Sequence, residues 1–114
     1  MKMKKHSAYK NFQDEILNSI VSSIVATADP DKVILFGSRA RGKQRKDSDY
    51  DICVLKKYVK RNRTLAVKIR SDINVFAPID IIVTTPSRYE ELKDKCYFVY
   101  SDVEQYGKVV YEKR

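Results

Sequence analysis

The sequence predicts an α/β fold of the α+β kind, in which a small mixed β-sheet is flanked by helices. Three observations support this prediction. Apolar residues recur at helical spacing near the N-terminus, short β-branched runs lie between glycines and prolines, and helical and strand patterns then alternate. The length of 114 residues suits one domain, so we expect a single domain over residues 1–114.

The first helix is expected over residues 9–28, where apolar side chains return every three or four positions. Pro30 should end this helix, because the residue before a proline avoids the helical conformation. Residues 32–36, KVILF, then predict a buried strand. The following residues 37–51, GSRARGKQRKDSDYD, are polar and predict a loop that adds nothing to the core.

A second strand is expected over residues 50–55. Side chains alternate between the two faces of a strand, so this pattern separates two sets: Asp49, Asp51 and Cys53 on one face, and Tyr50, Ile52 and Val54 on the other. Residues 56–70 then contain seven basic residues and no acidic one. They lead into a helix with a positive outer face, whose expected inward stripe is Leu65, Ala66, Ile69, Ile73 and Phe76.

A third strand is expected over residues 79–83, IDIIV, after Pro78. Asp80 within it needs an explanation, because a buried carboxylate requires a partner. Thr85-Pro86-Ser87 should open another helix, with Ser87 and Glu90 spaced as a capping box. Residues 97–114 predict a helix and then a strand, divided at Gly107.

Composition limits the classes of function. No apolar stretch reaches the about 20 residues of a membrane span, and no signal segment is evident, so we expect a soluble, cytoplasmic protein. Cys53 and Cys96 lie far apart, which argues against a disulfide framework or a thiolate zinc site. Cys53 is expected to be a small buried residue, and His6 a tail residue. The formal net charge of +8 indicates an anionic partner without saying which kind.

Two familiar motifs can be tested against residues 37–58 and rejected. Residues 37–43 match the G-x-x-x-x-G-K pattern of a P-loop, but Gln44 stands where a hydroxyl is needed for magnesium. Residues 47–51, DSDYD, imitate the start of an EF-hand calcium loop. However, Ile52 replaces the required glycine and Tyr58 replaces the bidentate glutamate.

A third interpretation uses the whole segment. A Gly-Ser turn follows a strand directly, and an Asp-x-Asp pair begins the next strand after a ten-residue spacer. Asp49 and Asp51 share a face and can converge on one metal ion or two, and Asp80 on a neighbouring strand can complete the site. Each acid taken singly can also be structural, since aspartate is common in turns.

These residues resemble a known family. Residues 37–42 (GSRARG) and 48–51 (SDYD) resemble the signature of the minimal nucleotidyltransferases of the DNA polymerase β superfamily. Residues 79–83 resemble the strand that bears the family's third acid. The small size and the lack of an added domain are similar to the antitoxin-type members that are paired with HEPN-domain toxins.

The resemblance implies a nucleotidyltransferase-like fold, Mg²⁺ or Mn²⁺ and ATP as cofactors, and transfer of AMP to a hydroxyl, tyrosine in particular, of a co-encoded HEPN-domain partner. It implies that Asp49, Asp51 and Asp80 are catalytic and bind the metal, and that Gly37, Ser38, Arg39 and Arg41 bind the nucleotide.

Two other functions stay open at this point: a non-catalytic module that neutralises its partner by contact alone, and a basic protein that binds nucleic acid. Residues 56–70 can steer an acidic partner, bind RNA or simply be solvated. The sequence does not determine the oligomeric state.

Overall fold

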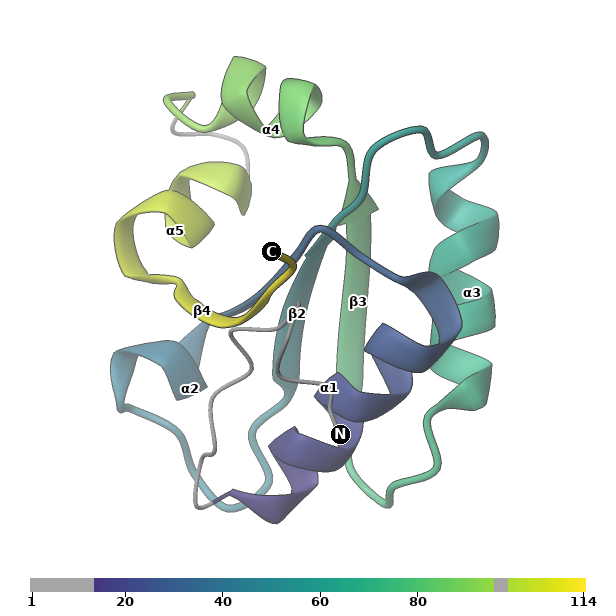
Figure 1. Cartoon of the computed structure of the whole chain (residues 1–114). Helices are drawn as coiled ribbons and strands as arrows, with labels where there is room; N and C mark the ends of the chain where they lie inside the picture. The colour runs from purple at the N-terminus through teal and green to yellow at the C-terminus, as the bar shows by residue number, and fades with distance from the viewer. Residues whose placement is uncertain (1–13, 96–98) are drawn as a thin grey trace.

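The computed structural model describes residues 14–95 and 99–114. Expectations for His6, for residues 9–13 and for Cys96 lie outside the described residues. Within the described residues, helices and strands follow one another as shown in Figure 1. They are α1 (Glu15–Ala28), β1 (Lys32–Phe36), α2 (Ser38–Arg41), β2 (Tyr50–Leu55), α3 (Asn62–Asp72), β3 (Ile79–Thr84), α4 (Pro86–Leu92), α5 (Val99–Tyr106) and β4 (Lys108–Glu112).

The four strands form one mixed sheet in the order β3-β2-β1-β4. Strand β1 is antiparallel to β2 and to β4, whereas β2 and β3 are parallel. The parallel pair requires a crossover, which α3 supplies. This arrangement confirms the predicted fold class.

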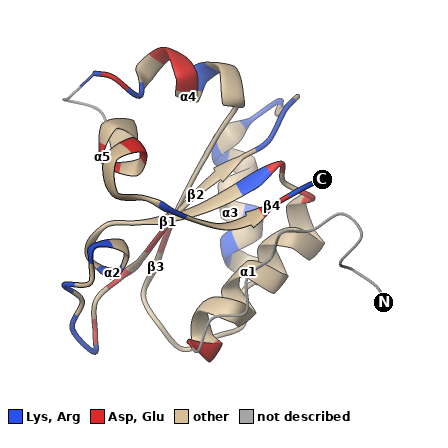
Figure 2. Ribbon diagram, turned by 60° about the vertical axis from the view of Figure 1, so that its left-hand side comes forward, with Lys and Arg blue, Asp and Glu red and all other residues tan. Residues whose placement is uncertain are grey.

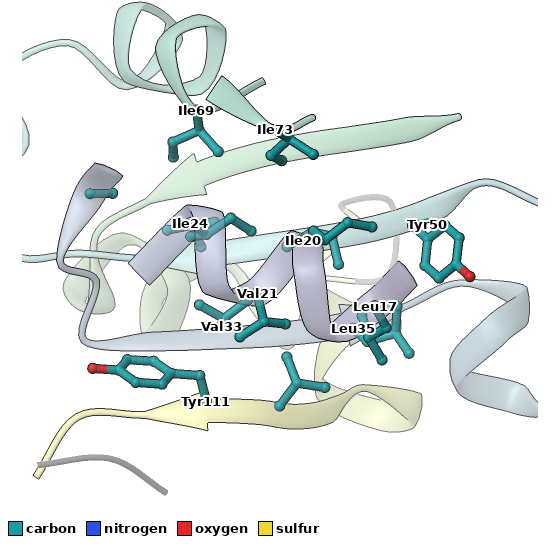
Figure 3. Close-up of a cluster of buried hydrophobic side chains, with 14 of the residues drawn as sticks. Leu17, Ile20, Val21, Ile24, Val33, Leu35, Tyr50, Ile69, Ile73 and Tyr111 are labelled. Atoms are coloured by element: carbon teal, nitrogen blue, oxygen red, sulfur yellow. The ribbon is translucent and has the colours of Figure 1, made fainter. Parts of the chain in front are cut away.

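Helices cover both faces of the sheet. Helices α1 and α3 pack on one face, and their buried side chains form the larger core with β1 and β2 (Figure 3). On the other face, a smaller cluster joins the sheet to α4 and α5 through Tyr89 and Val103. Figure 1 shows these two pairs of helices on opposite sides of the strands.

Local signals in the sequence explain where the helices begin and end. Asp14 caps α1 by accepting a hydrogen bond from the Leu17 N–H at 3.1 Å, and Asp29 ends the helix in the left-handed conformation. Helix α4 begins with Pro86, and the Thr85 side chain accepts from the Arg88 N–H at 3.2 Å. The predicted capping box at position 87 is therefore wrong, because the hydroxyl of residue 85 occupies the N-cap.

Three further expectations need comment. The predicted loop contains the one-turn helix α2, whose Ala40 is buried, because Gly37 and Gly42 provide the conformations at its two ends. Helix α3 ends at Asp72, so Phe76 lies beyond it and is fully exposed instead of inward. The division of the C-terminal segment at Gly107 is confirmed.

The helices within the described residues include none that is both long and apolar enough to span a membrane.

Candidate active site

The predicted acidic residues lie at one end of the sheet, where β1 ends and β2 and β3 begin. Asp51 is paired with Phe36 on β1 and with Asp80 on β3, so the two aspartates are neighbours across parallel strands. Asp49 comes two residues earlier than Asp51. The predicted alternation is confirmed, because Cys53 belongs to the cluster under α4 and α5 while Tyr50 belongs to the opposite core.

Gly37 brings its backbone directly against this acidic end. Its φ of 74° and ψ of −157° are a conformation that side-chain-bearing residues essentially never adopt. A Cβ added to Gly37 would lie 2.1 Å from Oδ2 of Asp51. The turn therefore needs glycine for two separate reasons, its backbone conformation and the close approach of the Asp51 carboxylate.

Helix α2 begins directly after this turn. The Gly37 carbonyl accepts hydrogen bonds from the N–H groups of Ala40 and Arg41, at 3.1 and 3.2 Å. The N–H groups of the first helical residues, Ser38 and Arg39, have no partner inside a helix. Together with the Ser38 hydroxyl they provide donors that suit a phosphate group.

The acidic group, by which we mean Asp49, Asp51 and Asp80, has no partner within the described part of the chain. No described residue forms an ion pair or hydrogen bond with these carboxylates. Burial, and then the negative charges of Asp80, Asp49 and Asp102, raise the pKa of Asp51 above its ordinary value. Charges that repel one another in this way are stabilised by a cation.

The acidic group does not form a complete metal site by itself. Across residues 14–95 and 99–114, no group of three or more His, Cys, Asp or Glu side chains stands close enough together to hold a metal ion by itself. Magnesium usually binds through one or two carboxylates plus phosphate oxygens of the substrate, rather than in an all-protein cage. The residues present fit that mode of binding, in which the nucleotide contributes ligands.

Arg39 holds the loop that carries the acidic group. Its Nε and one terminal nitrogen donate to the Ser48 carbonyl at 3.1 and 3.0 Å, and that nitrogen also donates to the Lys46 carbonyl at 3.3 Å. The guanidinium lies 3.8 Å from the centre of the Tyr50 ring. These contacts fix the chain just before Asp49, and contact of Arg39 with a nucleotide stays a prediction.

Arg41 joins α2 to α5. It forms an ion pair with Asp102, and its guanidinium lies 4.4 Å from the centre of the Tyr106 ring. Asp102 also adds to the negative potential at Asp51. Sequence reasoning missed Asp102 and Tyr106, because they lie in a segment without a motif and reach the site only through the fold.

Two buried groups support the site. The Tyr50 hydroxyl donates to Oδ2 of Asp14 at 2.8 Å, and burial together with this hydrogen bond raises the pKa of Tyr50 to about 12. This bond ties the start of β2 to the start of α1. Burial raises the pKa of the Cys53 thiol to about 12, which leaves it protonated and unreactive and confirms its expected role as a small core residue.

The structure therefore has an acidic end of a mixed sheet, bordered by a Gly-Ser turn and a short helix, in an α/β protein. The family model described as "Polymerase beta, Nucleotidyltransferase" matches residues 18–113. The chain therefore belongs to the polymerase beta nucleotidyltransferase family.

Solved structures agree with this fold. The chain is similar to one in the crystal structure of a toxin-antitoxin with AMP-PNP, at 23% identity and a TM-score of 0.57, covering 83% of this chain and 72% of that one. A mutant of the toxin-antitoxin MntA-HpeT gives 21% identity, a TM-score of 0.56 and the same coverage.

A protein from Sulfolobus solfataricus, described as a candidate nucleotidyltransferase, is 28% identical, with a TM-score of 0.55 and coverage of 70% of this chain and 73% of that one. A comparison with curated proteins gave no significant match.

Proposed function

We propose that this protein is a magnesium- and ATP-dependent nucleotidyltransferase that transfers AMP to a hydroxyl, that of a tyrosine, on a co-encoded HEPN-domain toxin, and so acts as a cytoplasmic antitoxin. The observation that carries the proposal is the contact between the Gly37 turn and the Asp51 carboxylate. This contact supports the proposal because nucleotidyl transfer needs donors for phosphate close to acids that suit a cation.

The described residues suggest a role for each side chain in binding the nucleotide and the metal. Gly37, Ser38 and the following N–H group would bind the terminal phosphates, and Arg41 would neutralise pyrophosphate as it leaves. Asp49, Asp51 and Asp80 would hold the metal, which lowers the pKa of the acceptor hydroxyl and offsets the charge of the triphosphate. Arg39 would keep the Asp49 loop in place and would also contact the nucleotide.

The proposed reaction is a nucleophilic displacement at phosphorus. The hydroxyl oxygen of the acceptor bonds to the α-phosphorus of ATP, and the bond from that phosphorus to the oxygen bridging the β-phosphate breaks. Pyrophosphate leaves, and the hydroxyl proton passes to a carboxylate of the acidic group or to water. The protein contributes chiefly position and charge, as is usual for phosphoryl chemistry.

Structures of similar fold bear on the partner and on the nucleotide donor. Two structures of similar fold are toxin-antitoxin crystal structures, one of them with AMP-PNP. They support, by analogy of fold, a toxin partner and an adenine nucleotide as donor. The identity of the acceptor rests on the family resemblance of residues 37–51 and 79–83.

Intact mass spectrometry of the co-encoded protein, incubated with this chain, ATP and Mg²⁺, tests the proposal directly. A gain of one AMP is expected with the wild-type chain and none with Asp49→Asn or Asp51→Asn. Asp47→Asn is the matched control, since Asp47 lies exposed in the same loop and outside the acidic group.

Neutralisation of the partner by Asp49→Asn without a gain of mass would contradict the enzyme and favour inhibition by contact. Salt-sensitive RNA binding that survives loss of the acids would favour a nucleic-acid-binding protein instead.

A further inference from the structure

The two edges of the sheet differ. Edge strand β4 has the features by which proteins prevent unwanted strand pairing: its pairing with β1 is irregular between Val33 and Ile34, and the charged side chains of Lys108 and Glu112 are exposed at its two ends. Edge strand β3 has a regular six-residue register with β2 and a single charged residue, Asp80. It is the less protected edge.

The outward backbone groups of β3 can be assigned from the hydrogen bonds at its two ends. The carbonyls of Pro78 and Thr84 accept from β2 and from Lys56, at 2.9 and 3.0 Å. Backbone groups alternate in direction along a strand, so even-numbered residues of β3 bond to β2. The N–H and C=O groups of Ile79, Ile81 and Val83 therefore point away from β2, toward the edge where no other described strand pairs, although Val83 itself is buried.

Helix α3 leaves this edge partly open. The helix packs with α1 on the core face, where Ile79 and Ile81 also point, yet both side chains remain only half-buried. On the opposite face Asp80 is exposed and Ile82 is half-buried. Phe76 is fully exposed in the short segment between α3 and β3, which leads into the end of β3 that carries Asp80.

We propose that the β3 edge binds an extended segment of the acceptor polypeptide as an added antiparallel strand, with acidic residues flanking the acceptor hydroxyl. This inference rests on the proposed function and specifies how the acceptor is presented. Strand addition of this kind takes its affinity from main-chain hydrogen bonds and its specificity from alternate side chains.

The geometry of such a strand places its acceptor residue at the site. Asp80 directs its own backbone groups to β2, so it occupies a non-hydrogen-bonded position relative to the added strand. The two Cα atoms of such an antiparallel pair lie about 4.5 Å apart, and the side chains point to the same face. A hydroxyl-bearing residue opposite Asp80 thus projects on the face that carries Asp51 and Asp80.

Charge decides between possible occupants. Helix α3, packed on β3, exposes Arg63, Lys68 and Arg70 against one acid, Asp72, whereas the loop between α2 and β2 carries both basic and acidic residues (Figure 2). Pairing of two β3 strands would bring two such positive surfaces together in a chain of net charge +8. The neighbours of the acceptor residue in the added strand point to the opposite face from Asp80, where α3 packs, so acidic residues there complement the basic side chains of α3. Phe76 offers the segment an apolar contact.

Amide hydrogen exchange measured by NMR on the full chain tests the inference. With saturating co-encoded HEPN-type partner, the amides of the half-buried residues Ile79 and Ile81 should exchange at least tenfold more slowly. The amide of Ile82 serves as internal control, because it already bonds to β2 and should change little. An unchanged rate at the amides of Ile79 and Ile81, or no detectable complex, overturns the inference.

Other occupants are separate outcomes of the same measurement. Protection that rises with the concentration of this chain alone would mean self-pairing, and protection by a single-stranded RNA oligonucleotide would mean a nucleic-acid partner. Either result would overturn the inference. Edge protection by a partner that gains no AMP would leave docking intact and refute the proposed enzyme activity, so the two failures are distinguishable.

A pair of variants at one position gives a second test. Ile81→Pro removes an outward N–H while leaving the hydrogen bonds to β2, which is the kind of position where edge strands accept proline. Partner affinity should fall at least tenfold relative to Ile81→Val, while ATP affinity measured by calorimetry stays the same in both. Equal partner affinity of the two folded variants would contradict the docking mode.

Discussion

Replacing Gly37 by alanine tests the contact between the turn and the acidic group. The new Cβ would lie 2.1 Å from Oδ2 of Asp51, whereas real Cβ contacts do not come closer than 3.0 Å. The Asp51 carboxylate must therefore move by about 1 Å, a displacement that costs on the order of 100-fold in rate when it misplaces a catalytic group. The glycine-only backbone conformation adds a loss of about 1–3 kcal/mol in the free energy of unfolding.

Two assays separate these effects. Transfer of AMP should fall about 100-fold in Gly37→Ala, and the melting temperature should drop by about 4–12 °C at roughly 4 °C per kcal/mol. Gly37→Val should also block entry of the nucleotide, which an ATP titration by calorimetry measures.

Gly42→Ala is the matched control, because Gly42 has the same φ of 74° but nothing within 4 Å of an added Cβ. It should lose stability by about 1 kcal/mol and keep its activity. If Gly37→Ala and Gly42→Ala retained equal activity, the close approach of Gly37 to Asp51 would have no functional meaning and the reasoning would be refuted.

Three further predictions follow from the surroundings of the site. Because burial and like charges raise the pKa of Asp51, the folded state holds this proton to higher pH than the unfolded state, and stability falls as pH rises through that window. In metal-free buffer at pH 7, Asp51→Asn should therefore have a higher melting temperature than the wild type. The difference should vanish at pH values below the ordinary pKa range of carboxyl groups. A difference that stays constant with pH would contradict this explanation. Asp102→Asn removes the ionic partner of Arg41, so the KM for ATP should change while the same substitution at exposed Asp94 leaves it unaltered. In a Cys96→Ser chain, Cys53 should resist a thiol reagent at pH 8 until the protein is unfolded, since burial raises its thiol pKa to about 12; labelling of the native protein would disprove that burial.

The sequence by itself determined most of the local structure, because local structure follows local signals. Alternation along residues 50–55 correctly predicted that Asp51 and Tyr50 lie on opposite faces of the sheet. Gly107 correctly marked the change from helix to strand. The prediction for Phe76 was wrong, because the apolar helical pattern in the sequence continues four residues past the end of α3. Periodicity alone does not show where a helix stops when no strong end signal follows it.

Tertiary structure decided how distant residues meet. The sequence predicted that Asp80 joins Asp49 and Asp51 from a neighbouring strand, but the parallel register that pairs Asp80 with Asp51 comes from the fold. The approach of Gly37 to Asp51 and the ion pair of Arg41 with Asp102 also join segments far apart in the chain. Such contacts depend on sheet order and helix packing, which no single window of sequence encodes. For the same reason, only the fold reveals β3 as an edge strand, because being at an edge means lacking a neighbour in space.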